Sequence, residues 1–304
     1  MTFRFLFGAA VVAALLSTTA IASAAPHHGG AYTCSGGVWT GDPSTSTWVS
    51  IPSGTYDSIK ITGVCDVVPD AVINVKGDIT VARGGLFNAQ SAPSTITVGH
   101  DVTAGAGSFL GLGCQSNFDH TPHPCAIEPD GASVITVNGD VKAKNAFLVL
   151  LNGITVKKNV ELTGGGGGDW AEKHNMIGGN LSIHNVTPDF MGVEFNTVGG
   201  NVDLKNIWAI DPEDGGFGAV NVVVNTIGHD LHCKGLGPRL TGGFIPGEVN
   251  IVAHKTTGQC VVDPGSGLVF APGSELRAIA ARLRCHYRIP DRHLRREEVR
   301  DCKT

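Results

Sequence analysis

Short runs of alternating apolar and polar residues recur through the middle of the chain, and each run follows a turn. In each unit an aliphatic residue precedes two turn residues, then an Asn or Asp, then the aliphatic residue that opens the alternating run. Alternation with period two and many β-branched residues predict strands. Seven units start at Val75, Val98, Val137, Val156, Ile177, Val198 and Ile227. Consecutive starts lie roughly 20 residues apart, except before Val137 and before Ile227, where the longer intervals contain insertions.

Repeated strand–turn–strand units of about 20 residues are typical of a parallel β-solenoid, in which stacked coils share one continuous core. Glycine suits a left-handed or tight turn where a Cβ would clash, and Asn or Asp bonds nearby backbone. We therefore expect the turn Asn and Asp side chains to stack as a ladder. The predicted fold is an all-β, right-handed parallel β-helix of about eight coils, with its hand taken from the rule for parallel connections. The alternative, a β-sandwich, needs a turn about every 8–12 residues.

The N-terminal segment 1–24 is predicted to be a secretory signal peptide. Arg4 is the only charged residue before Pro26, an apolar run from Leu6 to Leu16 follows it, and Ala22-Ser23-Ala24 has the small-x-small form of a cleavage site. The run is shorter than the roughly 20 residues of a membrane span. We expect a secreted, extracellular protein, free or associated with the cell wall, with no transmembrane segment.

The cysteines favour disulfides, because their number is even, the chain is predicted to be exported and no CxxC occurs. Each neighbouring pair brackets a segment without the repeat, which suggests pairing in sequence order, although other connectivities stay open. The expected pairs are Cys34–Cys65, Cys114–Cys125, Cys233–Cys260 and Cys285–Cys302.

Composition divides the chain into four parts: the signal peptide 1–24, a disulfide-bearing N-terminal cap 25–65, the solenoid 66–270 and a basic tail 271–304. Eight of the 11 arginines lie between Arg277 and Arg300, and Leu276, Ile279 and Leu283 follow helical spacing. The tail is either a solvated, short helical segment or a site for anionic cell-wall polymers or lipid headgroups.

The overall composition excludes several classes of protein. Only 16% of residues are charged, which argues against a coiled coil or a charge-driven disordered chain. The net charge of −5 argues against a nucleic-acid binder.

Catalytic candidates are weak. The turn residues Asp78, Asp101, Asp140 and Asp230 suggest the carboxylates of a polygalacturonase or the Ca²⁺ site of a pectate lyase, both parallel β-helices. However, Asn159, Asn180 and Asn201 occupy the same turn position. Alternation of Asp with Asn predicts a role in bonding backbone rather than in acid catalysis. No nucleophile motif is present, so we assign no catalytic residue and expect a regular stack without a convergent polar cluster.

Metal candidates are His120 and His123 in a Pro-containing loop, and Asp211, Glu213 and Asp214 in an acidic turn. Imidazole suits zinc or copper and the carboxylates suit calcium. The competing interpretation is a disulfide-clasped surface loop and an acidic surface turn, so we expect no cofactor. Ice binding would require repeated Thr-x-Thr rows, and only Thr95-Ile96-Thr97 resembles one.

The segments Asn175–Leu181 and Asn196–Val202, with the ending Thr226–Cys233, resemble the repeats of a family of uncharacterised secreted actinobacterial β-solenoid (parallel β-helix) proteins. The opening Tyr32-Thr33-Cys34 is also similar to that family, and the resemblance extends over residues 31–260. It implies fold and export but no activity. A weaker resemblance is to the bactofilins, which are cytoplasmic polymers whose coils use a similar turn.

The function expected from these patterns is that of a secreted, non-enzymatic surface or matrix protein. Its expected partners are a cell-wall or extracellular polymer, or further copies of the chain. A carbohydrate-active enzyme on the same scaffold is the alternative, and it rests on fold analogy.

Overall fold

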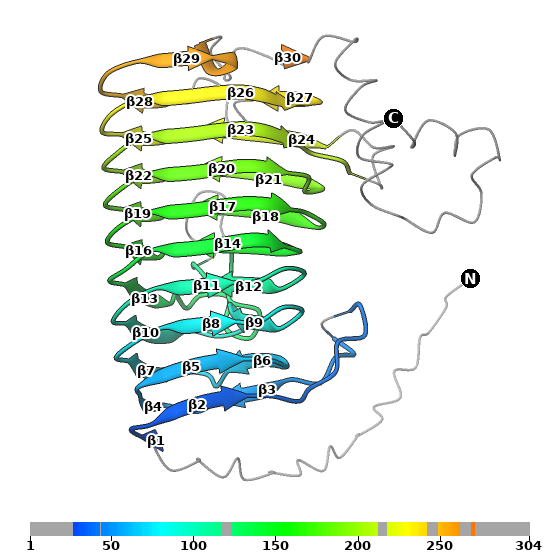
Figure 1. Cartoon of the computed structure of the whole chain (residues 1–304), viewed down its shortest axis with the longest axis vertical. Coiled ribbons are helices and arrows are strands. Elements are labelled where there is room, and N and C mark those ends of the chain that lie inside the picture. The colour runs from blue at the N-terminus through cyan, green and yellow to red at the C-terminus, as the bar shows by residue number, and fades with distance from the viewer. Residues whose placement is uncertain are drawn as a thin grey trace, which may run out of the picture.

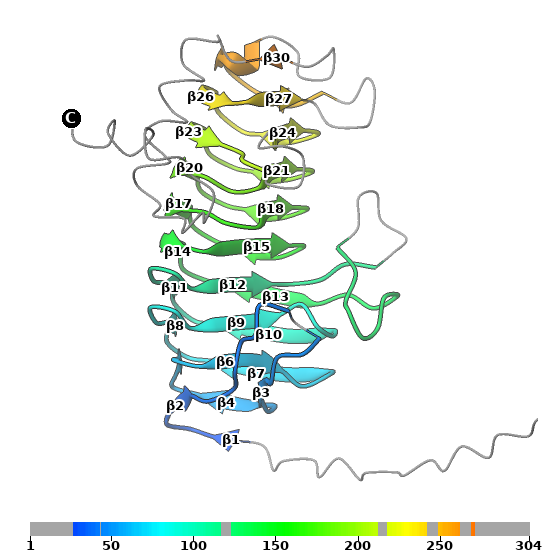
Figure 2. The ribbon, with the colours of Figure 1, turned by 90° about the vertical axis from the view of Figure 1, so that its right-hand side faces the viewer.

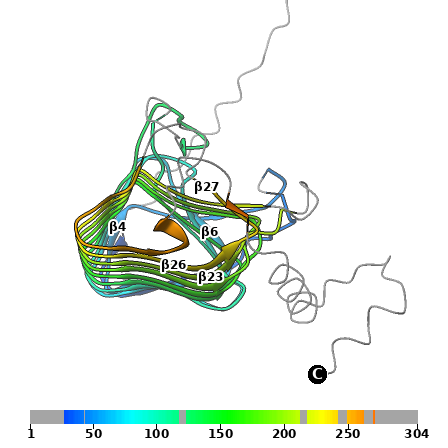
Figure 3. The same cartoon turned by 90° about the horizontal axis from the view of Figure 1, so that it is seen from above.

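The computed structural model describes residues 27–42, 44–116, 123–211, 218–241, 249–261 and 269–270. These residues form three sheets of ten strands each and one 3-10 helix, η1 (Gln259–Val261). The strands stack in layers along the long axis of the molecule (Figure 1), and the layers superimpose around a common interior when seen from above (Figure 3). This arrangement is consistent with the predicted parallel β-solenoid.

Each coil adds one strand to each sheet. The first sheet consists of β1 (His27–His28), β4 (Gly54–Tyr56), β7 (Ala71–Val75), β10 (Ser94–Val98), β13 (Val134–Val137), β16 (Thr155–Val156), β19 (Met176–Ile177), β22 (Thr197–Val198), β25 (Thr226–Ile227) and β28 (Ile251–Val252). The second consists of β2 (Ala31–Cys34), β5 (Ser58–Ile61), β8 (Ile79–Val81), β11 (Val102–Ala104), β14 (Val141–Ala146), β17 (Val160–Gly165), β20 (Leu181–Val186), β23 (Val202–Trp208), β26 (Leu231–Gly237) and β29 (Thr256–Gly258).

The third sheet, which Figure 2 presents, completes each coil. It consists of β3 (Val49–Ile51), β6 (Val64–Val67), β9 (Leu86–Ala89), β12 (Phe109–Leu112), β15 (Leu148–Asn152), β18 (Asp169–Lys173), β21 (Phe190–Glu194), β24 (Ala219–Val223), β27 (Arg239–Thr241) and β30 (Val269–Phe270). Neighbouring strands are parallel in all three sheets except for β30, which runs antiparallel to β27.

Ten strands per sheet correct the expected number of about eight coils. The first, second and last coils carry no complete turn motif and are defined by strand pairing. Strands β1–β6 also belong to the same three sheets, so residues predicted as a separate N-terminal cap begin the stack. The predicted signal peptide 1–24 and basic tail 271–304 lie outside the described residues.

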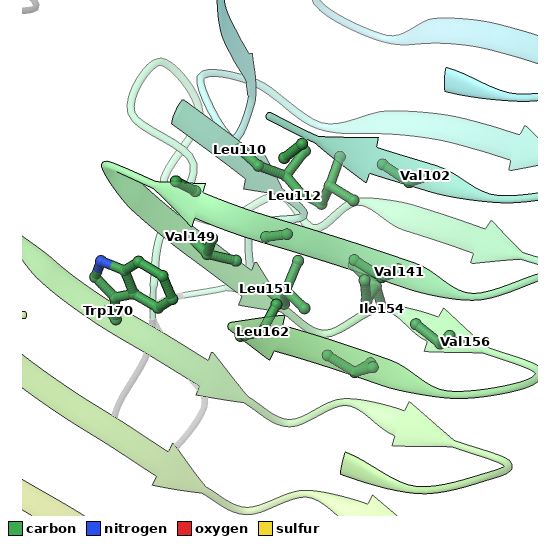
Figure 4. Packing of buried hydrophobic residues seen from close by; sticks show 14 of the residues in the cluster. Val102, Leu110, Leu112, Val141, Val149, Leu151, Ile154, Val156, Leu162 and Trp170 are labelled. Carbon is green, nitrogen blue, oxygen red and sulfur yellow. The ribbon is translucent and has the colours of Figure 1, made fainter. Parts of the chain in front are cut away.

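The interior is built from columns of aliphatic residues. Val98 of β10 lies beside Val75 and Val137 on its two neighbouring strands, and all three are fully buried. Figure 4 shows part of this core, including Leu112 and Leu151 of the third sheet and Val141 of the second. Burying each large aliphatic side chain stabilises the fold by roughly 1.5–3 kcal/mol.

Insertions leave the stack at its corners. The segment between β12 and β13, residues 113–133, is a long addition to the coil that begins at Val98. Val98 and Val137 are nevertheless direct register partners on adjacent strands. The strand register of the core is therefore not changed by the inserted segment between β12 and β13.

Three of the four predicted disulfides are confirmed, and two of them join the outermost coils of the stack. Cys34–Cys65 links β2 to β6, and Cys233–Cys260 links β26 to η1. Cys114–Cys125 closes part of the insertion that follows β12. Cys285 and Cys302 lie outside the described residues.

Removing an end disulfide should loosen that end alone, because coils of a solenoid are coupled mainly to their neighbours. We expect Cys34→Ser/Cys65→Ser to lose amide protection in β1–β6 while β14–β23 keep theirs, as measured by hydrogen exchange. The matched control, Cys114→Ser/Cys125→Ser, should leave both ends protected. A uniform loss along the whole stack would contradict the expectation.

Candidate binding face

The turn Asn and Asp side chains form a continuous column of hydrogen bonds, as predicted. Oδ1 of each residue accepts the backbone N–H of the residue one coil later, at 2.8–3.1 Å. The column runs through Asp78, Asp101, Asp140, Asn159, Asn180, Asn201 and Asp230 to the N–H of Lys255. These carboxylates and amides therefore join coils.

The close approach of this column also explains the glycine of the turn. A Cβ at Gly200 would collide with Oδ1 of Asn180, and one at Gly179 with Oδ1 of Asn159. Neither glycine has a positive φ, so the tight packing of the ladder, rather than a left-handed backbone, requires glycine here.

A second column of asparagines was missed from the sequence. Asn175, Asn196, Asn225 and Asn250 stack at the corner between the third and first sheets, and the first three are 1% exposed. Oδ1 of Asn196 accepts the N–H and the Nδ2 of Asn175, each at 3.0 Å, and its Nδ2 donates to the carbonyl of Glu172 at 2.7 Å. The available signal was an Asn two residues before the units at Ile177, Val198 and Ile227.

The outward positions of the second sheet form a broad polar surface, here called the polar face. Residues that are register partners on successive strands form two columns along the stack, and Figure 1 shows the strands that carry them. The first column consists of Lys142, Glu161, Ser182, Asp203, His232 and Thr257. The second consists of Lys144, Thr163, His184, Lys205 and Lys234.

The polar face is hollowed over β20, β23, β26 and β29. Polar side chains from four successive coils line the hollow almost entirely. Its lining consists of Asn180, Ser182, Asn201, Val202, Asp203, Lys205, Asp230, His232 and Thr257. The hollow therefore runs along the stack and crosses several coils.

Asp203 is the central carboxylate of the hollow. It accepts a hydrogen bond from Nζ of Lys205 at 2.7 Å, and Nε2 of His184 lies 3.0 Å from the same oxygen. Partial burial opposes ionisation, but the bond and charge of Lys205, with His184, hold the pKa of Asp203 below its ordinary value. Asp203 is thus a carboxylate at neutral pH and an acceptor of hydrogen bonds.

A column of left-handed residues borders the polar face at the corner with the third sheet. Asn145, Asn185 and Asn206 have φ of 54°, 57° and 52°, and Gly164 and Gly235 occupy the same place in other coils. Asn and Gly tolerate this backbone far better than other residues. The exposed amides of these asparagines add donors and acceptors beside the lysine column.

Each of the two predicted metal sites lies partly outside the described residues. Burial, with the charge of Lys173, lowers the pKa of the His123 imidazole, and the carbonyl of His123 accepts the N–H of Gln115 at 2.8 Å. Asp211 follows β23, whereas His120, Glu213 and Asp214 lie outside the described residues. Among the residues with assigned positions, no group of three or more His, Cys, Asp or Glu side chains could hold a metal ion.

The expectation of a stack without a convergent polar cluster is wrong. At the C-terminal ends of β18 and β21, in the middle of the third sheet, Nζ of Lys173 lies 3.4 Å from Glu194, which also accepts Nδ2 of Asn221 at 3.1 Å. Asn152 precedes Lys173 in register, and both of its side-chain polar atoms are buried without a partner. Glu194 is 1% exposed and Asn152 fully buried, so this cluster offers no open surface to a polymer.

The threonines of the first sheet agree with the sequence, in which only Thr95-Ile96-Thr97 resembles a Thr-x-Thr row. Thr97 lies beside Thr136, and Thr136 beside Thr155, so one threonine column continues through three strands. The row is a single column, since Val134 stands where a second threonine would follow Thr95. The paired Thr-x-Thr array that ice binding would require is therefore absent from β13, the strand next to β10.

Comparison with protein-family models, curated proteins and solved structures gives no significant match. Within the described part of the chain, no helix has the length and apolar character needed to cross a membrane.

Proposed function

We propose that this protein is a secreted, non-enzymatic binding protein that presents its polar face to an extended extracellular polymer. The observation that supports this most directly is the hollow on the polar face, whose polar residues repeat coil by coil along the stack. A rigid array of polar positions, one per coil, suits a ligand that is itself a repeating chain. Because the protein side is already ordered, it loses little conformational entropy on binding. The disulfides and the predicted signal peptide support an extracellular, cell-wall-associated location.

The carboxyl groups whose pKa is raised lie away from this face, which argues against hydrolysis there. Hydrolysis of glycosides uses a carboxylic acid whose pKa is raised, paired with a second carboxylate. Burial raises the pKa of Glu172 and of Asp66, but Glu172 lies among core residues and Asp66 belongs to β6 of the third sheet. The pKa of Asp203 on the polar face is lowered, as is that of Asp140 in the turn before β14.

The alternative is a carbohydrate-active enzyme on this scaffold, for which the hollow holds one suitable feature. Asp203, contacted by His184, is an ionised carboxylate beside an imidazole in an accessible position. Such a pair can remove a proton from a bound sugar. We also propose that the solenoid is right-handed, from the rule for parallel connections. Its relationship to the secreted actinobacterial family is likewise part of the binding-protein proposal and rests on the turn motifs.

Binding without cleavage is the expected result when purified mature protein is incubated with a panel of cell-wall and plant polysaccharides. Co-sedimentation or affinity electrophoresis measures binding, and reducing-end and unsaturated-product assays measure cleavage. If the protein released cleavage products and Asp203→Asn abolished that release, the enzyme hypothesis would replace the binding proposal. Absence of binding to every polymer would overturn it outright.

A further inference from the structure

We infer that the polymer is an acidic polysaccharide, whose carboxylates are bound by the lysine column Lys144, Lys205 and Lys234 of the polar face. This inference rests on the proposed function, since it names the ligand of the same face. It assigns specificity to lysines that no catalytic or metal motif includes.

The second column of the polar face is positively charged. Its five described positions hold three lysines, His184 and Thr163, with no acidic residue among them. Lys144 and Lys234 are exposed, so their ammonium groups are free to meet a ligand. Lys205 is paired with Asp203, so in this chain of net charge −5 it is chiefly Lys144 and Lys234 whose positive charge attracts the carboxylates of a ligand.

The neighbouring columns decide between kinds of polyanion. Asp203 and Asp230 line the hollow beside Lys205, so a chain that bears only anionic groups would meet two carboxylates there. Sugar hydroxyls instead donate hydrogen bonds to such carboxylates. A ligand with both carboxylates and hydroxyls, such as a polyuronate, matches both columns.

The geometry of the stack sets the direction of the ligand. Lys205 and Lys234 are register partners on adjacent strands, about 4.8 Å apart along the axis. Lys144 lies three coils from Lys205, through Thr163 and His184, on a straight column. One coil is close to the length of one sugar residue in an extended glycan, so the chain lies parallel to the stack.

The test compares three lysines on the face with three elsewhere. Lys144→Ala/Lys205→Ala/Lys234→Ala removes the column, and Lys157→Ala/Lys158→Ala/Lys255→Ala removes the same charge from exposed turns. The probes are polygalacturonate, neutral dextran and inorganic polyphosphate, titrated by calorimetry at low and high salt. Circular dichroism establishes that both variants keep the fold.

We expect polygalacturonate to bind more tightly than dextran or polyphosphate, and to bind more weakly at high salt. The face variant should lose about tenfold or more in affinity, whereas the turn variant should change by less than about threefold. Equal losses in both variants, or preference for polyphosphate, would overturn the inference.

Failure of the inference can be told apart from failure of the proposed function. Binding of dextran with the same affinity as polygalacturonate, undiminished in the face variant, refutes an acidic ligand but leaves a polymer-binding protein. Binding to none of the probes or of the wider panel refutes both.

Discussion

Replacing Asn196 with alanine should destabilise the protein by about 3–6 kcal/mol, several times the effect of the same change at Asn180. Both residues belong to hydrogen-bonded columns, but the Asn196 column is buried and the Asn180 column is exposed. Without the Asn196 side chain, the N–H of Asn175 and the carbonyl of Glu172 lose their partners inside the stack. In the Asn180 variant, water can accept the N–H of Asn201 in place of the Asn180 side chain. We therefore expect the free energy of unfolding to fall by about 0.5–1.5 kcal/mol.

Urea unfolding followed by circular dichroism measures the difference between Asn196→Ala and Asn180→Ala. Hydrogen exchange locates it, and the amides of Asn175 and its neighbours should lose protection in the Asn196 variant alone. Similar losses for both variants would show that the buried column contributes no more than the exposed one.

Replacing Glu172 with leucine should stabilise the protein at neutral pH, by about 2–4 kcal/mol. Glu172 occupies an inward position of β18, between Leu151 and Val193 on the adjacent strands, and is fully buried. Neither of its carboxyl oxygens has a hydrogen-bond partner. Leucine would continue the aliphatic column and leave no polar group unpaired.

The stabilisation should depend on pH in a defined direction. Burial raises the pKa of Glu172 well above its ordinary value of 4.5, so the folded state keeps a proton that the unfolded chain loses. The native protein therefore loses stability as pH rises from about 4.5 towards the folded-state pKa, by at most about 1.4 kcal/mol per pH unit. Below pH 4.5 this contribution is absent.

Unfolding midpoints of native protein, Glu172→Leu and Glu172→Gln between pH 4 and pH 8 measure this effect. The advantage of both variants over the native chain should grow as the pH increases. Glu194→Leu is the matched control, because Glu194 is also buried but contacts Lys173 and Asn221, and its loss should destabilise. A constant difference between native protein and Glu172→Gln across this range would contradict the raised pKa.

The regular features of the fold could be predicted from the sequence because they repeat. Seven turns with the same order of an aliphatic residue, two turn residues and an Asn or Asp indicated the stacked coils, and the Asp–Asn alternation indicated a structural ladder. The disulfides followed from cysteines placed around segments without the repeat. In the turns and the ladder, the same close packing between coils recurs and requires the same residue types in each repeat.

Features that depend on register between distant coils could not be read in this way. The lysine column joins Lys144, Lys205 and Lys234, which no local pattern connects, and only strand pairing brings them into line. The contact of Lys173 with Glu194 likewise requires the alignment of β18 with β21. The number of coils was underestimated because the coils at the two ends carry no complete motif and are defined by strand pairing alone.

The partnership of Val98 and Val137 across residues 113–133 shows that this corner accepts long additions without penalty to the strand order. Lineages sharing such a scaffold can thus acquire or exchange loops while inheriting the same rod. The corner after β12 is equally a place where an engineer could graft a foreign epitope or enzyme, displayed from a stiff support whose ends are already locked.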